Sequence, residues 1–259
     1  MIIILSGFFV YGMSVWFLWY RYESNSSFHF FDDSLEWGGM DKMGHIFSSF
    51  VLVSVIHEIL QLVDSDKIKT LIFSVLLTFL LMMSIEFLDG FCDGYGASYF
   101  DAIANVTGIG FAIIWIIILK RKNGILKLSY FDTWYTLIRP NMLGDTLAGK
   151  IIKDYNGEAF WICISPYFWH KSLHWWPKWL NIAIGYGIDG YLGGHDNIWK
   201  EGNDIINYSH INRSSSVYVS LDINLELIPY KINNKWILTL IRIINFTKIP
   251  LPIWEVWKW

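Results

Sequence analysis

Long uninterrupted runs of apolar residues dominate the first half of the chain. Residues 2–20 carry no charged side chain, and about 20 such residues suffice to cross the hydrocarbon core of a bilayer. Three further apolar runs cover residues 44–63, 68–88 and 102–119. The pattern predicts about four transmembrane or membrane-inserted helices. The first run lacks the basic start and the small-residue cleavage site of a signal peptide, which favours an anchor, and whether residues 1–20 are cleaved stays open.

The second half of the chain shows a different periodicity. Residues 217–228 alternate apolar side chains with polar ones, which is typical of an amphipathic strand. Residues 159–165 and 181–188 are also predicted to be strands, and 141–152 and 236–246 to be short helices. We therefore expect a mainly α membrane protein, with a helical domain at residues 1–122 and an aromatic-rich, membrane-associated α+β region at 123–259.

Composition supports a membrane protein and excludes several other classes. Apolar residues make up 54% of the chain and charged residues 17%, whereas soluble domains contain about 25% charged residues. The net charge of -3 gives no electrostatic reason to expect a nucleic-acid partner. Cys92 and Cys163 form no Cys/His cluster, so a thiolate zinc site is not expected.

The distribution of basic residues predicts an orientation. Lys67, Lys69 and the run 120–122 follow the second and fourth apolar runs, whereas residues 89–99 contain no Lys or Arg. Four spans with the basic loops in the cytoplasm satisfy the positive-inside rule. The acidic loops would then face the periplasm or the exterior. The side that holds residues 121–259 stays open, as does the choice between inner and outer membrane.

Polar residues gather where three of the predicted helices reach the outer side. Candidates for catalysis are five residues at these helix ends: His45, Glu86, Asp89, Asp101 and Asn105. Ionisable groups at membrane depth cost roughly 2.5–3.5 kcal/mol each on insertion scales, so one mutually satisfied cluster is the economical arrangement. Asp41 shares a helix face with His45 and joins the same cluster.

Three interpretations of this cluster remain open. Asp41, Asp89 and Asp101 could instead cap helix ends, with Ser98 and Asp101 forming a capping box. Alternatively, His45, Glu86, Asp89 and Asp101 could bind a divalent metal ion, because imidazole and carboxylates together suit such ions. A purely structural polar plug is the remaining possibility.

Tryptophans concentrate at the start of the second half, at positions 161, 169, 175, 176 and 179. Trp, Tyr and Lys together are the usual anchors at a membrane surface. The same residues would equally suit a compact aromatic core. An exposed aromatic surface of this kind could also bind an envelope protein partner.

The motifs at the helix ends resemble a known family. DKxGH at residues 41–45, ExxDG at 86–90 and GxSxxDxxxN from residue 96 resemble the VanZ-like membrane proteins, most closely the uncharacterised YfiM-like envelope group. The second half resembles extended members from Bacteroidetes-type bacteria in KDYNGEAFW and PKWLNIAIGYGIDGYLGG. The resemblance implies a bacterial cell-envelope protein and no particular reaction.

Two functions follow from these observations. In the first, an integral envelope protein binds or processes an envelope lipid or lipid-linked headgroup in a polar pocket at one membrane face, with membrane lipids as its partners. In the second, the chain is a non-enzymatic subunit or scaffold of an envelope assembly. Whether it is an enzyme stays open.

Overall fold

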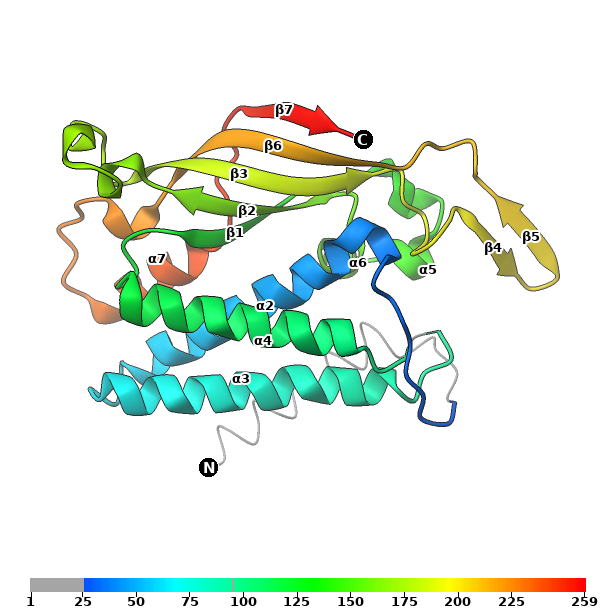
Figure 1. Cartoon of the computed structure of the whole chain (residues 1–259), viewed down its shortest axis with the longest axis horizontal. Coiled ribbons are helices and arrows are strands. Elements are labelled where there is room, and N and C mark those ends of the chain that lie inside the picture. The colour runs from blue at the N-terminus through cyan, green and yellow to red at the C-terminus, as the bar shows by residue number, and fades with distance from the viewer. Residues whose placement is uncertain (1–25, 95) are drawn as a thin grey trace.

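The computed structural model describes residues 26–94 and 96–259. Three long helices form one layer and a curled antiparallel sheet forms the other (Figure 1). The predicted helix at residues 2–20 lies outside the described residues.

The helical layer consists of α2 (Met40–Leu60), α3 (Lys67–Asp89) and α4 (Tyr99–Ile113), and α4 continues as a π-helical turn at Ile114–Ile118. All three are long and apolar enough to cross a membrane by length and composition. Asp66 caps α3 by accepting hydrogen bonds from two backbone N–H groups of the first turn, and Ser98 does the same for α4. The helix starts therefore follow from ordinary capping chemistry.

The second half builds a five-stranded sheet in the order β1-β2-β3-β6-β7 and a separate hairpin, β4–β5. The strands are β1 (Ile125–Tyr130), β2 (Glu158–Ile164), β3 (Leu180–Asp189), β4 (Ile198–Glu201), β5 (Asp204–Asn207), β6 (Ser214–Ile223) and β7 (Ile253–Lys258). With seven strands beside six helices in the described part of the chain, the fold is mixed α/β. The expectation of a mainly α protein is wrong, because β1, β4, β5 and β7 carry no clean alternation in the sequence.

Shorter helices flank the sheet: α5 (Pro140–Leu143), α6 (Leu147–Lys153) and α7 (Lys235–Ile244). The predicted helix at 141–152 is split into α5 and α6 because Gly144 adopts a positive φ of 96°, which glycine accepts without strain. The predicted strand at 217–228 ends early, because Asn224 caps a 3-10 turn at Leu225–Leu227.

The sheet curls so that its two edges approach each other. Residues 246–248 run parallel to β1, with Leu128 N–H donating to the Phe246 carbonyl and Lys248 N–H to the Leu128 carbonyl. This segment leads directly into β7 at the opposite edge. The inner face of the curl carries the core residues Ile125 and Trp161 together with buried polar side chains. Lys127 and Asp222 are fully buried there and form an ion pair at 3.0 Å.

The helices and the sheet share two hydrophobic clusters. Phe50 of α2 and Trp115 of the π-helical turn pack with Phe246, and this cluster extends to Trp161 of β2. A second cluster joins Trp37 and Met40 to Phe160 on the outer face of the sheet. The division into residues 1–122 and 123–259 stays a prediction of domain organisation.

Candidate functional site

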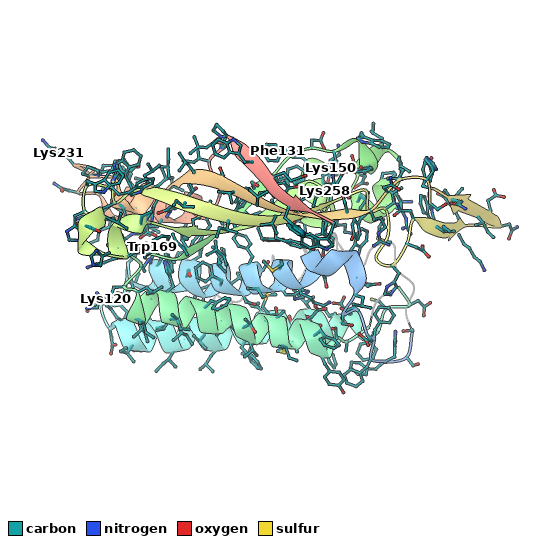
Figure 2. All side chains as sticks on the ribbon, turned by 45° about the horizontal axis from the view of Figure 1, so that its top comes forward. Lys120, Phe131, Lys150, Trp169, Lys231 and Lys258 are labelled. Atoms are coloured by element: carbon teal, nitrogen blue, oxygen red, sulfur yellow. The ribbon has the colours of Figure 1, made fainter. Side chains whose placement is uncertain are left out.

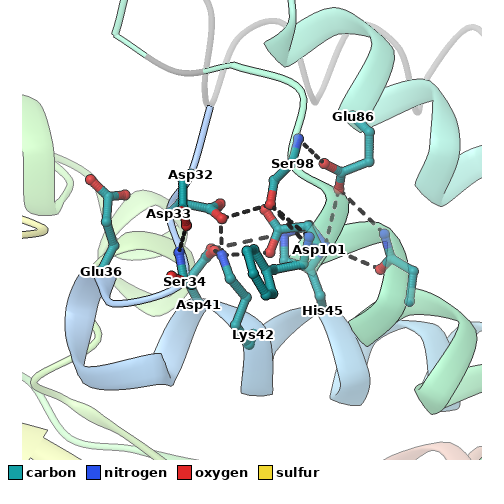
Figure 3. Close-up of polar contacts among 12 residues, drawn as sticks. Asp32, Asp33, Ser34, Glu36, Asp41, Lys42, His45, Glu86, Ser98 and Asp101 are labelled. Atoms are coloured by element: carbon teal, nitrogen blue, oxygen red, sulfur yellow. Dashed lines mark hydrogen bonds and ion pairs between the residues drawn. The ribbon is translucent and has the colours of Figure 1, made fainter. Parts of the chain in front are cut away.

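The polar cluster lies where α2 begins, α3 ends and α4 begins (Figure 3). Antiparallel packing of α3 against α4 brings Glu86 and Asp101 to the same level. Gly108 lets α4 approach α2 closely, since a Cβ there would lie 2.2 Å from the Ile46 carbonyl oxygen. The sequence also suggests such a role for Gly110, but a Cβ there would meet nothing within 4 Å, so Gly110 has no part in the close approach.

Lys42 occupies the centre of the cluster. Its ammonium lies 2.6 Å from Asp33, 2.8 Å from Asp41 and 2.7 Å from Asp101. Three carboxyl groups therefore surround one ammonium in a largely buried place. Ser98 Oγ donates a hydrogen bond to Asp33 Oδ1 at 2.6 Å. This bond holds Asp33, which precedes α2, against the start of α4.

His45 lies between two sets of acceptors. Its Nδ1 is 3.1 Å from Asn105 Oδ1 and 3.4 Å from Glu86 Oε1. Its Nε2 is 3.8 Å from one carboxylate oxygen each of Asp41 and Asp101. An imidazole with carboxylates at both nitrogens is suited to accepting and passing on a proton.

Glu86 and Asn105 are held by fixed donors. Asn105 Nδ2 donates to Glu86 Oε1 at 3.3 Å, and Ser49 Oγ donates to Asn105 Oδ1 at 3.1 Å. The backbone N–H of Ser98 donates to Glu86 Oε2 at 3.4 Å. These contacts orient Glu86 toward His45, one turn inside the end of α3.

The second half of the chain adds two groups beside the cluster. Tyr155 donates from its hydroxyl to Asp41 Oδ1 at 2.8 Å. Burial and the nearby Asp41 hold the pKa of the Tyr155 hydroxyl well above its usual value. Burial, with Asp154 and Asp41 adding negative charge, likewise raises the pKa of Glu158 well above its ordinary value.

Part of the cluster remains open to solvent. The side chains of Asp41, Lys42 and His45 keep 15–20% of their accessible surface, whereas Glu86 and Asp101 keep 8%. The cluster is thus partly accessible at one end of the helices, with Asp41, Lys42 and His45 nearest to solvent.

A metal ion could be held by Asp41, His45 and Asp101, whose ligand atoms all lie within 4.8 Å of one another. The oxygens that face His45 Nε2 are Asp41 Oδ1 and Asp101 Oδ2. Ligand atoms about 3.3 Å apart would suit tetrahedral zinc, so these atoms would have to close in slightly.

Sequence reasoning brought together most of these residues. His45 lies beside three of the predicted residues, namely Glu86, Asp101 and Asn105. Asn105 in turn donates a hydrogen bond to Glu86. Asp89 lies half-buried at the last position of α3. The candidate metal site in the structure consists of Asp41, His45 and Asp101, whereas the predicted set had Glu86 and Asp89 and lacked Asp41. Their catalytic and metal-binding roles stay predictions.

The capping alternative fails for Asp41 and is incomplete for Asp101. Gly39 is the N-cap of α2, so Asp41 lies inside the helix. Ser98 caps α4, but the carboxylate of Asp101 binds Lys42 in place of completing a capping box. Asp89 is the last residue of α3, at the end opposite to that where a side-chain N-cap acts.

Sequence reasoning did not place four groups in the cluster: Asp33, Lys42, the hydroxyl of Ser98 that donates to Asp33, and Tyr155. The position of Lys42 between Asp41 and a helical apolar run was the available signal, since a lysine at the start of a membrane helix needs a counter-ion. Tyr155 is 114 residues from Asp41, and nothing in the local pattern links the two.

Comparison with known proteins finds one similarity. A family model described as a predicted periplasmic lipoprotein (DUF2279) matches residues 29–117. The match covers α2, α3 and α4 and includes the Lys42 cluster. No curated protein and no solved structure matches. This match is consistent with a cell-envelope protein, and it corrects the VanZ-like assignment, because short motifs at helix ends do not separate unrelated membrane families.

Proposed function

We propose that the chain is an integral protein of the bacterial cell envelope that binds an amine-bearing lipid headgroup at the Lys42 cluster. The observation that carries the proposal is that four carboxyl groups gather around one ammonium and one imidazole, in a partly solvent-exposed place at the end of three apolar helices. The similarity to a periplasmic lipoprotein family supports an envelope location.

The orientation of α3 supports insertion in a membrane. Its buried side chains include Thr70, Ser74, Thr78 and Glu86. The spacings between them are four or eight residues, so they lie along one face of the helix. The opposite face exposes large apolar side chains, among them Ile72, Leu76, Phe79, Leu80 and Phe87. A helix in water buries its apolar face. The reverse arrangement is favourable only where an apolar medium surrounds the helix.

The sheet shows the same reversal. Ile162, Ile184, Val219 and Trp254 lie directly opposite one another across four strands on its outer face. Three of them, Ile162, Ile184 and Trp254, are exposed, while the inner face holds the Lys127–Asp222 pair. Helices and sheet together therefore present apolar side chains outward.

Charge selects the ligand. Asp33, Asp41, Asp101 and Glu86 surround one ammonium and one imidazole. A phosphate would be repelled, because phosphoryl groups are bound by arginine, lysine or metal ions. A primary ammonium can donate up to three hydrogen bonds to carboxylates. A quaternary ammonium cannot donate, so the site should prefer phosphatidylethanolamine to phosphatidylcholine.

The position of His45 favours a second candidate function, acid–base catalysis of headgroup hydrolysis, in which water adds across the headgroup ester bond that breaks. Its Nε2 faces the more accessible Asp41, while its Nδ1 contacts Asn105 and Glu86. In this arrangement His45 would act as acid or base and Glu86 would hold its charge.

A lipid competition tests both candidates. The purified full chain is incubated with an equimolar mixture of phosphatidylethanolamine and phosphatidylcholine, repurified, and its bound lipids are measured by mass spectrometry. We expect enrichment of phosphatidylethanolamine, lost in Asp41→Asn. New lipid fragments that are absent with His45→Gln would establish catalysis.

Asp32→Asn is the matched control, because Asp32 is an exposed carboxylate beside Asp33 whose own side chain accepts from Ser34 N–H. It should leave the enrichment unchanged. Equal retention of the two lipids by the unmodified chain would refute headgroup binding, and equal enrichment in Asp41→Asn would refute the assignment of the site.

A further inference from the structure

The end of the molecule opposite the Lys42 cluster is formed by three segments. These are the basic turn at residues 120–122, the aromatic segment at 166–179 and helix α7. Lys120, Trp169 and Lys231 lie together at this end in Figure 2. We call it the basic aromatic end.

Specific contacts hold the three segments together. Glu58 near the end of α2 forms ion pairs with both Arg121 and Arg242 of α7, and Glu226 pairs with Arg121 at 3.0 Å. Asn123 Oδ1 accepts from the N–H of Ser165 at 2.7 Å, which fixes the start of the aromatic segment. The basic aromatic end is therefore one surface.

Helix α7 is oriented with its apolar side outward. Trp236, Leu240 and Ile244 recur at every fourth position and are exposed. Thr239 is buried and donates from Oγ1 to Glu58 at 3.4 Å, on the same side as Arg242. A short amphipathic helix that exposes its apolar face is suited to the boundary between headgroups and acyl chains.

The tryptophans of this end also face outward. Trp169 is 58% exposed, Trp175 73% and Trp236 68%. The compact aromatic core that the sequence allowed is therefore wrong for Trp169 and Trp175, whereas Trp161 is 1% exposed and does belong to the core. Indole rings combine an apolar body with an N–H donor and favour the interface of a membrane.

Lysines supply an unmatched positive charge at the same end. Lys120, Lys122 and Lys235 are exposed, and no described residue forms an ion pair with them. The acidic residues nearby are already engaged. Glu58 and Glu226 bind the two arginines, Asp64 binds Lys69 at 2.8 Å, and Asp66 caps α3.

We propose that the basic aromatic end lies in a membrane leaflet and binds the phosphate groups of anionic phospholipids. The lysines would contact phosphates while α7 and the exposed indoles enter the acyl boundary. Charge complementarity singles out anionic lipids, since uncharged apolar contacts alone would accept any lipid. This proposal rests on the membrane insertion in the proposed function and is independent of the ligand at the Lys42 cluster.

The test uses the full chain reconstituted in phosphatidylcholine vesicles. Flotation first establishes insertion. Spin-labelled phosphatidylglycerol and spin-labelled phosphatidylcholine are then compared by the motionally restricted fraction of their spectra. We expect phosphatidylglycerol to associate roughly threefold to fivefold more strongly, which corresponds to about one lysine–lipid contact near the surface.

The variant K120Q/K122Q/K231Q/K235Q should reduce this preference to about one, because it removes exposed lysine charges of this end. The control variant K150Q/K200Q/K258Q should keep the preference, because its lysines lie away from this end. Figure 2 labels Lys150 and Lys258, and Lys200 belongs to β4, which Figure 1 places at the far side of the molecule from α7. Equal association of the two lipids with the unmodified chain, or loss of preference in the control alone, would overturn the proposal. Failure to float would instead refute the membrane insertion in the proposed function.

Discussion

Replacement of Lys42 by Met tests whether the cluster is held together by its single ammonium. The side chain is 16% exposed and contacts Asp33, Asp41 and Asp101 within 2.8 Å. Its removal leaves three carboxylates facing one another without a cation. Removing one partner of a buried ion pair costs about 3–5 kcal/mol, and the partial exposure places Lys42→Met near the lower figure.

A loss of about 3 kcal/mol corresponds to a fall of about 6–12 °C in melting temperature for a chain of this size. Thermal unfolding of the purified protein in detergent measures it. The loss should shrink in acid, where the carboxylates take up protons, and it should shrink when Asp101→Asn is added to Lys42→Met.

Lys69→Met is the matched control, because Lys69 also binds an aspartate at 2.8 Å but is 73% exposed. Exposed pairs contribute about 0–1 kcal/mol, so its melting temperature should change by less than about 4 °C. Equal effects of the two substitutions, or a Lys42→Met loss that acid does not relieve, would refute the reasoning.

Three further predictions concern packing, pH and the buried pair of the sheet. Gly108→Ala should cost about 1–3 kcal/mol because its Cβ meets the Ile46 carbonyl, whereas Gly110→Ala should stabilise by up to about 1 kcal/mol; equal melting temperatures would contradict this. The folded state keeps a proton on Glu158 that the unfolded state releases above about pH 4.3, so stability should fall by about 1.4 kcal/mol per pH unit as pH rises. Glu158→Gln should flatten that slope between pH 5 and 7, and parallel slopes would exclude Glu158 as its source. Lys127→Met should lower the free energy of unfolding by about 3–5 kcal/mol, since it leaves the fully buried Asp222 without its cation. The double variant Lys127→Met/Asp222→Asn should recover part of the lost melting temperature. No recovery would show that the broken pair is not the cause of the loss.

Those parts of the fold that depend on local patterns could be predicted from the sequence. The apolar runs located α2, α3 and α4, and alternation located β2, β3 and much of β6. Polar residues inside apolar helices, such as His45 and Glu86, indicated the cluster because burial forces such groups to find partners.

The remaining features depend on partners that are distant in sequence. Strand β1 contains Lys127, whose partner Asp222 lies 95 residues away, so its polar character gave no sign of a buried strand. Asp33 pairs with Lys42, but the hydroxyl that fixes its carboxylate belongs to Ser98, which is 65 residues away. No local periodicity reports such pairs, and the mixed α/β class was missed for the same reason.

The closure of the sheet by residues 246–248 has a consequence for the time course of synthesis. Lys127 needs Asn245, which follows it by 118 residues. At about 5–20 residues per second, the ribosome takes roughly 6–24 seconds to deliver that partner. For this period the edge of β1 is open, although α2, α3 and α4 are already complete. A nascent chain halted before residue 245 should therefore expose Lys127 to an amine-reactive reagent that the finished protein excludes.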